Sequence, residues 1–128
     1  MIYFFDNCIS YRFADMLRAL GEEVESLREK YPEDIKDIAL FPELRNRRDI
    51  VFVSTDTSQW TRTEEARAIK AAGITTLYFG PFFQRKLLWD QAVWLMRRWL
   101  KIKGFAEGAA KGTCAEIKEN GRALVFPL

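Results

Sequence analysis

The amino-acid sequence predicts an α/β fold with a mainly parallel sheet and helices on both of its faces. Short, continuous hydrophobic runs such as IVFV at residues 50–53 are typical of strands that are buried on both faces. Segments with apolar residues three and four positions apart, typical of amphipathic helices, separate these runs. Strands that alternate with helices pair in parallel, because each helix carries the chain back across the sheet.

The hydrophobic pattern divides the first part of the chain into alternating strands and helices. The strands are expected at residues 2–5, 23–27, 50–53 and 74–79. The helices are expected at residues 9–20, 34–47 and 61–72. This order, strand then helix throughout, predicts crossover connections that cover both faces of the sheet.

Glycine, proline and capping residues mark the ends of these helices. Gly21 and Gly73 follow the first and third helices as C-terminal stops. Pro42 lies inside the second helix and should kink or shorten it. Thr61, with Glu64 three residues later, has the form of a capping box that opens the third helix.

The last third of the chain departs from this alternation, because residues 84–103 have the spacing of one long helix. Its apolar residues form two adjacent stripes, Leu88, Ala92, Leu95, Trp99 and Ile102 in one and Trp89, Val93, Met96 and Leu100 in the other. A sheet covers only part of so broad a face, so we expect a homodimer or another protein to cover the rest. Trp89, Trp94 and Trp99 are expected to pack in the core or in such an interface rather than to stack on bases.

The chain ends in a strong hairpin signal, Asn120-Gly121, between two alternating runs in residues 113–126. A chain of 128 residues with 48% hydrophobic residues can bury one ordinary core. We therefore expect a single domain over residues 1–128, in which residues 84–128 form an extension of helix and hairpin.

The composition excludes several classes of function. The chain contains no histidine, which rules out Ser-His-Asp and Cys-His catalysis and histidine-ligated zinc. The net charge is only +2, so a nucleic-acid partner would have to be recognised by local positive charge.

Cysteine use and hydropathy indicate a cytoplasmic protein. Cys8 and Cys114 do not form a CxxC pair, and both are expected to be reduced, buried thiols. No basic leader precedes a long apolar stretch, as a signal peptide requires. No run approaches the roughly 20 apolar residues of a membrane helix, so we expect no membrane partner.

Carboxylates directly follow two of the expected strands. Asp6 ends the first strand, and Asp56 follows the strand at residues 50–53. Ligands of an open parallel sheet bind at the carboxyl ends of its strands, where adjacent strands would bring these carboxylates together. A hard divalent cation such as Mg²⁺ or Mn²⁺ relieves the repulsion between them. Metal-bound water then provides a route to phosphodiester hydrolysis that needs no histidine.

A third carboxylate is expected near the start of the second helix, where Glu33, Asp34 and Asp37 are candidates. Asp37 is preferred because it lies within the first turns, away from the apolar face. In the third helix, capping accounts for Glu64, which leaves Glu65 as the candidate for a fourth carboxylate. Each acid also has an ordinary explanation as a helix cap, first-turn or turn residue, so the joint placement carries the metal hypothesis.

Three motifs of this sequence together resemble the PIN-like domains, most closely the branch of VapC-type toxins. They are IYFFDNCISYRFADMLRALGEEV, an acidic helix entry, and IVFVSTD followed by TRTEEARAIKAAGI. The resemblance covers about residues 1–80. It implies a three-layer α/β/α fold and a metal-dependent endoribonuclease, the toxin of a toxin-antitoxin pair.

The resemblance also implies roles for individual residues. The residues implied to be catalytic are Asp6, Asp37, Asp56 and Glu65, with Glu64 as the alternative to Glu65. The three aspartates would hold Mg²⁺ or Mn²⁺. Asn7 and Thr55 match polar positions that can support the site.

RNA that approaches a cluster of carboxylates needs positive charge around it. Arg12, Arg62 and Arg67 could flank the site and bind RNA, although each is explained equally well as a solvated helix residue. The expected partners are an RNA substrate, a cognate antitoxin, and a second copy of the chain bound through the helix at residues 84–103.

Two other interpretations stay open at this point. One is a catalytically silent PIN-like module that binds RNA or protein, which should hold no ion between Asp6 and Asp56. The other is a flavodoxin-like or receiver-like domain with an acidic pocket. A receiver-like domain predicts a phosphorylated aspartate beside a lysine, and the sequence marks no such position.

Overall fold

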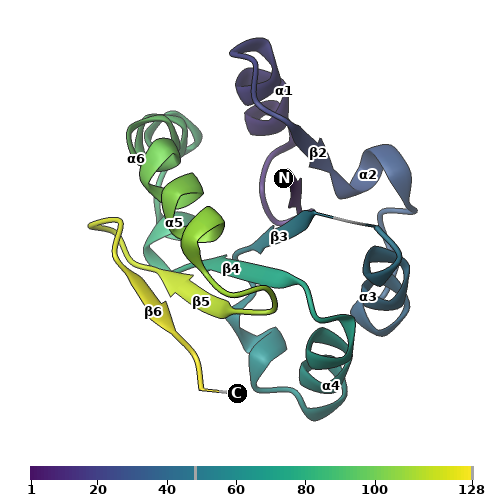
Figure 1. The fold of residues 1–128 in the computed structure, drawn as a ribbon. Coiled ribbons are helices and arrows are strands. Elements are labelled where there is room, and N and C mark those ends of the chain that lie inside the picture. The colour runs from purple at the N-terminus through teal and green to yellow at the C-terminus, as the bar shows by residue number, and fades with distance from the viewer. Residues whose placement is uncertain (48, 128) are drawn as a thin grey trace.

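A computed structural model describes residues 1–47 and 49–127 as an α/β fold built on one six-stranded sheet (Figure 1). The strands are β1 (Ile2–Phe5), β2 (Val24–Ser26), β3 (Ile50–Ser54), β4 (Thr75–Phe79), β5 (Cys114–Ile117) and β6 (Ala123–Val125). Their order across the sheet is β2-β1-β3-β4-β5-β6. All neighbours pair in parallel except β5 and β6, which form an antiparallel hairpin. The predicted fold class is confirmed.

The helices lie on both faces of this sheet and give it three layers (Figure 1). They are α1 (Tyr11–Ala19), α2 (Leu27–Lys30), α3 (Asp37–Arg45), α4 (Thr63–Ala72), α5 (Phe82–Arg85) and α6 (Leu88–Gly108), with a 3₁₀ turn, η1 (Thr57–Trp60). Helices α1, α5 and α6 pack on one face, and α2, α3 and α4 pack on the other. None of the described helices is long and apolar enough to span a bilayer.

The central strands are hydrophobic throughout because both of their faces are buried. In β1, Phe5 contributes to the core under α1 and α6, while its neighbour Phe4 contributes to the core under α3. In β3, Val53 and Phe52 divide between the same two cores. All four side chains are fully buried. The sequence pattern of continuous rather than alternating hydrophobicity follows from this double burial.

The prediction of one long helix at residues 84–103 is wrong in its bounds. The chain forms the short helix α5 first, and Lys86 and Leu87 are extended before α6 begins at Leu88. Helix α6 then continues to Gly108, beyond the predicted end, because Ala106 is still fully buried in the core. Packing on the sheet therefore outweighs the low helix propensity of Gly104.

The predicted capping box of Thr61 and Glu64 is also wrong. Helix α4 begins at Thr63 with Arg62 at its N-cap, and no side chain caps it. Thr61 instead ends η1 and donates its hydroxyl to the carbonyl of Ser58 at 2.9 Å. The 3₁₀ turn takes residues that the sequence pattern assigns to the helix.

Two further differences concern the first half of the chain. Helix α3 is shorter than predicted, covering Asp37–Arg45 with Pro42 inside it, as the proline led us to expect. Cys114 is buried as predicted, but Cys8 is exposed. The short helix α2 was not predicted, since the four residues of α2 are too few to show a helical period.

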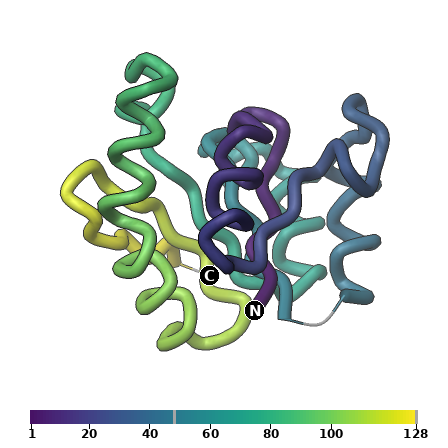
Figure 2. The backbone as a smooth tube through the Cα atoms, turned by 90° about the horizontal axis from the view of Figure 1, so that it is seen from above, coloured from purple at the N-terminus to yellow at the C-terminus, as the bar shows by residue number. Residues whose placement is uncertain are grey.

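The predicted hairpin at Asn120-Gly121 is present, and α6 packs against its tip. Figure 2 shows α6 and the hairpin together at one end of the molecule. The indole of Trp94 donates to the carbonyl of Glu119 at 2.8 Å. Gly121 has a φ of +85°, and an added Cβ would lie 3.1 Å from the Cδ atoms of both Arg98 and Lys101. The turn therefore favours glycine through its positive φ, and a Cβ would also be in tight contact with two side chains of α6.

We expect Gly121→Ala to lower the free energy of unfolding by about 1–2 kcal/mol, because alanine is strained at positive φ and meets α6. Urea denaturation followed by circular dichroism measures the change. The matched control is Gly104→Ala in α6, where no atom lies within 4 Å of an added Cβ. It should stabilise the protein by about 0.5–1 kcal/mol. Equal effects of the two substitutions would contradict this account of Gly121.

Candidate functional site

The candidate site lies at the carboxyl ends of the two central strands, β1 and β3. These strands are neighbours in parallel register, with Phe5 opposite Val53. Asp6 directly follows β1, and its backbone N–H still donates to the carbonyl of Val53 at 2.9 Å. Asp56 lies just beyond the end of β3. The two carboxylates therefore leave the sheet at the same edge, as predicted.

Ser54, the last residue of β3, connects these two aspartates. Its hydroxyl donates to Oδ2 of Asp6 at 2.8 Å and accepts the backbone N–H of Asp56 at 3.1 Å. The backbone N–H of Asn7 donates to the other oxygen of Asp6 at 2.8 Å. Burial nevertheless raises the pKa of Asp6, and the charge of Asp56 adds to the rise, while the Ser54 and Asn7 hydrogen bonds oppose it.

Of the three acids considered for the third carboxylate, the structure brings Asp37, the first residue of α3, close to Asp6. Gln59 in η1 donates through one Nε2 to Oδ2 of Asp37 at 2.8 Å and to Oδ2 of Asp6 at 3.4 Å. Glu33 instead pairs with Arg28 at 3.3 Å.

The pKa of Asp37 shows how closely the carboxylates are gathered. Its side chain is only 19% exposed. Burial raises its pKa to about 6, with further contributions from the charges of Asp6, Glu65 and Asp56 that outweigh the Gln59 hydrogen bond in sum. Burial is thus the main cause of the raised pKa, and three neighbouring carboxylates add to it.

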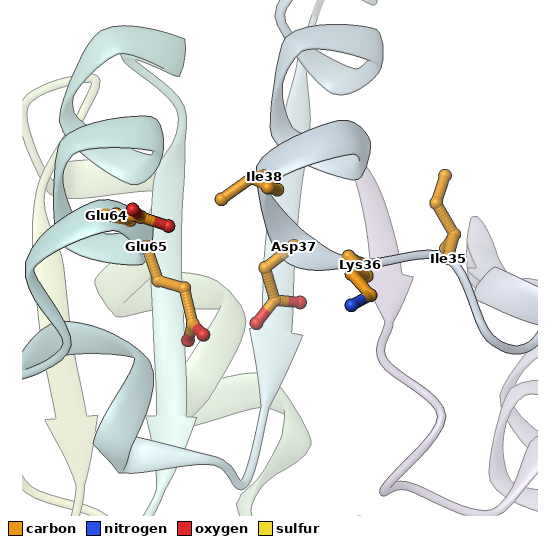
Figure 3. Close-up of a pocket in the computed structure, with 6 residues that line it drawn as sticks. All are labelled: Ile35, Lys36, Asp37, Ile38, Glu64 and Glu65. Atoms are coloured by element: carbon orange, nitrogen blue, oxygen red, sulfur yellow. The ribbon is translucent and has the colours of Figure 1, made fainter.

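The predicted fourth acid, Glu65, faces the same space from α4. Figure 3 shows the carboxylate of Glu65 on α4 and that of Asp37 on α3 pointing into the space between the two helices. Glu64 lies further from Asp37. A cavity of about 390 Å³ opens there, lined by Ile35, Lys36, Asp37, Ile38, Glu64 and Glu65. A second cavity of about 320 Å³ is lined in part by Asp6 and Asn7. The acids can thus be reached from solvent.

Arg62 supplies the positive charge between these acids. Its guanidinium lies 2.8 Å from Oδ2 of Asp56 and 2.5 Å from Oε2 of Glu65. The same group is 4.0 Å from Oδ2 of Asp37. One side chain at the start of α4 therefore balances carboxylates from three different elements.

The other predicted arginines do not take part in this arrangement. Within the part of the chain that the structure describes, the side chains of Arg12 and Arg67 form no ion pair. Both are exposed. Their contact with RNA stays a prediction.

Asn7 and Thr55, predicted to support the site, hold its loops. Asn7 Nδ2 donates to the carbonyl of Glu33 at 2.6 Å, which ties the loop after β1 to the segment before α3. Thr55 accepts a hydrogen bond from Gln84 and donates its backbone N–H to the sulfur of Cys8 at 3.3 Å. The thiol of Cys8 is in turn 3.4 Å from the hydroxyl of Ser54.

Two residues of the site, Ser54 and Gln59, were not predicted from the sequence. Ser54 carries a weak signal, because it is the one polar residue in the otherwise apolar strand β3. Gln59 carries none, since its position depends on η1. Its side chain is 1% exposed, and Oε1 has no hydrogen-bond partner among the described residues.

The acids of the site have the right chemistry to bind a divalent cation, but their present spacing does not form a metal site. Carboxylate oxygens are the donors that Mg²⁺ and Mn²⁺ prefer. In the described ranges, however, no group of three or more His, Cys, Asp or Glu side chains is spaced to hold an ion as it stands. The Gln59 amide and the Arg62 guanidinium lie between the acids. The donor set fits a divalent cation, provided that Arg62 moves aside.

Comparison with known families assigns the first part of the chain. A family model described as a PIN like domain matches residues 1–80. The matched range contains strands β1 to β4 and all four predicted acids, and the description names no particular branch of the family. Searches of curated proteins and of solved structures return no significant match.

We expect Asp37→Asn to stabilise the protein near pH 7.5 by up to about 3 kcal/mol. Because the pKa of Asp37 is raised to about 6 in the folded state, the stability linked to its proton is complete below about pH 4 and lost as the pH rises through 6. The gain from asparagine should therefore vanish near pH 4. Urea denaturation at both pH values measures it, with Asp34→Asn as a control at an exposed carboxylate of the same segment. A loss of stability at pH 7.5 would contradict the assigned cost of burying the Asp37 charge beside other carboxylates.

Proposed function

Because the chain belongs to the PIN-like domain family, we propose that it is a metal-dependent endoribonuclease. The observation that carries the proposal is the convergence of Asp6, Asp37, Asp56 and Glu65 at one edge of the parallel sheet. Those acids come from four separate segments of the chain, and burial together with neighbouring carboxylates raises the pKa of Asp6 and of Asp37. An arrangement that costs stability and serves no packing role is typical of a functional site.

Asp6, Asp37 and Asp56 would hold Mg²⁺ or Mn²⁺, which when bound supplies an activated water and offsets negative charge on the scissile phosphate. Glu65 lies within reach of the same space. Ser54 and the backbone of Asn7 fix both oxygens of Asp6 and so orient its carboxylate. Gln59 connects Asp6 and Asp37 through the two hydrogen bonds of its Nε2.

Arg62 has a second role in this proposal. A divalent cation and the Arg62 guanidinium compete for the same carboxylate oxygens, so the side chain has to swing away for the acids to bind metal. Its length allows the charged group to reach solvent while the backbone stays at the N-cap of α4. There it would meet an approaching phosphate, alongside the exposed Arg12 and Arg67.

The biological setting we propose is that of a toxin whose activity a cognate antitoxin restrains. Its support is the resemblance of the N-terminal motif IYFFDNC and of IVFVSTD to the VapC-type branch. A small open reading frame for a DNA-binding protein next to this one would support the pairing, and its absence would count against it.

A second candidate function is that of a catalytically silent PIN-like module that binds RNA or protein. The observation in its favour is Arg62, which neutralises the acids without any metal. The two candidates differ in whether the acids bind a divalent cation, so direct measurement of metal binding separates them.

Purified protein with Mn²⁺ should cleave RNA, and Asp6→Asn and Asp56→Asn should each lower the rate by about 100-fold or more, because each removes a carboxylate from the site. Gel assays on a mixed RNA substrate measure the rate. Asp15→Asn is a matched control, since Asp15 is a carboxylate of α1 that pairs with Arg18 away from the site. Cleavage without metal that survives both site substitutions would rule out the mechanism.

Arg62→Gln should raise the affinity for Mn²⁺ by about tenfold, because it removes the cation that competes for the carboxylates. Isothermal titration calorimetry measures this without any RNA. Arg67→Gln, in the same helix but outside the acidic site, should leave the affinity unchanged. A silent module would bind no Mn²⁺ in either form, and an unchanged affinity in Arg62→Gln would disprove the competition.

A further inference from the structure

Helix α6 presents a second apolar stripe to solvent, next to its buried face. Trp94, Leu95 and Ile102 are buried against the sheet. The outward stripe consists of Trp89, Val93, Met96 and Leu100, which are 80%, 38%, 40% and 77% exposed. The core of this chain is complete without these side chains, so their hydrophobicity calls for another partner.

The spacing of the outward stripe is that of a coiled-coil seam. Its residues are four, three and four positions apart, which places them alternately at the two apolar positions of a heptad. The order four, three, four reads the same in both directions along the helix. A helix with such a stripe can therefore pack against an antiparallel copy of itself.

We propose that the outward stripe of α6 binds the same stripe of a second copy of the chain, with the two helices antiparallel about a twofold axis between Val93 and Met96. In this arrangement Val93 packs against Met96 of the second copy, and Trp89 packs against Leu100. Every contact is made twice, as a twofold interface requires.

The charges beside the stripe favour a second copy, and an antiparallel one. Asp90 and Arg97 lie on the same flank, one helical heptad apart. Neither forms an ion pair within the described ranges. In an antiparallel pair each Asp90 faces Arg97 of the other copy, giving two ion pairs. A parallel pair would place Arg97 against Ala92 and lose both.

The shape of the surface is complementary in the same way. A groove of about 210 Å³ separates the C-terminal half of α6 from α1, lined by Leu17, Leu20, Glu22, Met96, Trp99 and Leu100. The antiparallel register brings Trp89 of the second copy over Leu100, beside this groove. The aromatic side chain of the stripe thus meets this hollow, and the same contact recurs at the other end of the interface.

This inference does not depend on the proposed nuclease activity. The outward stripe lies in residues 81–128, outside the range of the family match. Its test is the mass of the full-length protein in solution, and loss of RNA cleavage would leave the result unchanged.

Sedimentation equilibrium of the full-length protein should give a dimer, and Met96→Glu should weaken dimerisation at least about tenfold by burying a charge in the central layer. Leu124→Glu is the matched control, since Leu124 is an apolar residue 52% exposed on β6, away from the stripe. It should leave the dimer intact. Circular dichroism checks that both variants fold. A wild-type monomer at about 100 μM overturns the proposal, and so does a dimer that Met96→Glu leaves unchanged.

An exchange of the charges at Asp90 and Arg97 tests the antiparallel orientation of the two helices without changing an apolar residue of the stripe. Asp90→Arg should weaken the dimer, because each new arginine faces Arg97 of the other copy. The double variant Asp90→Arg with Arg97→Asp should restore the wild-type affinity, because the ion pairs reform in reverse. If Met96→Glu fails to fold, this pair of variants decides the question. Failure of the double variant to restore dimerisation overturns the antiparallel pairing.

Discussion

The parallel pairing of β1 with β3 is the constraint on which the candidate site depends. Its register sets Phe5 opposite Val53, so that the two strands end at the same level of the sheet. The side chain of Ser54 then connects Asp6 with the backbone of Asp56. A slip of one residue would turn Phe4 and Phe5 to the wrong cores, so the packing of the whole sheet fixes the distance between the two acids.

The balance of charge at this edge comes from one short segment, η1 and the start of α4. Gln59 supplies a neutral donor to Asp6 and Asp37, and Arg62 supplies a cation to Asp56 and Glu65. Two side chains three positions apart in sequence thus contact all four carboxylates, although only Arg62 brings a positive charge. A small change in this segment alters the electrostatics of the entire site without disturbing the sheet.

The sequence predicted the strands and the strand-end acids well, because each depends on a local signal. Continuous runs such as IVFV reflect burial on both faces, and Asp6 and Asp56 follow such runs directly. The break between α5 and α6 was not predictable, because hydrophobic spacing continues across the extended residues Lys86 and Leu87.

The contacts of Gln59 and Arg62 with the acids could not be predicted from the sequence, for a different reason. Gln59 reaches Asp37 across 22 positions of the chain, and this contact exists only after the 3₁₀ turn has formed. The same turn displaced the start of α4 from Thr61 to Thr63 and so placed Arg62 at the N-cap. Local patterns identify charged groups, but tertiary structure decides which groups neutralise them.

The family match ends at residue 80, directly after β4, yet β4 is an interior strand. It pairs with β5 on its far side, and its Phe79 packs on Trp94 of α6 with ring centroids 5.0 Å apart. A chain cut at residue 80 would carry a bare strand edge beside an uncovered apolar face, the combination from which sheets add foreign strands. The family match therefore ends inside the folded unit, because the sheet and its core continue past residue 80.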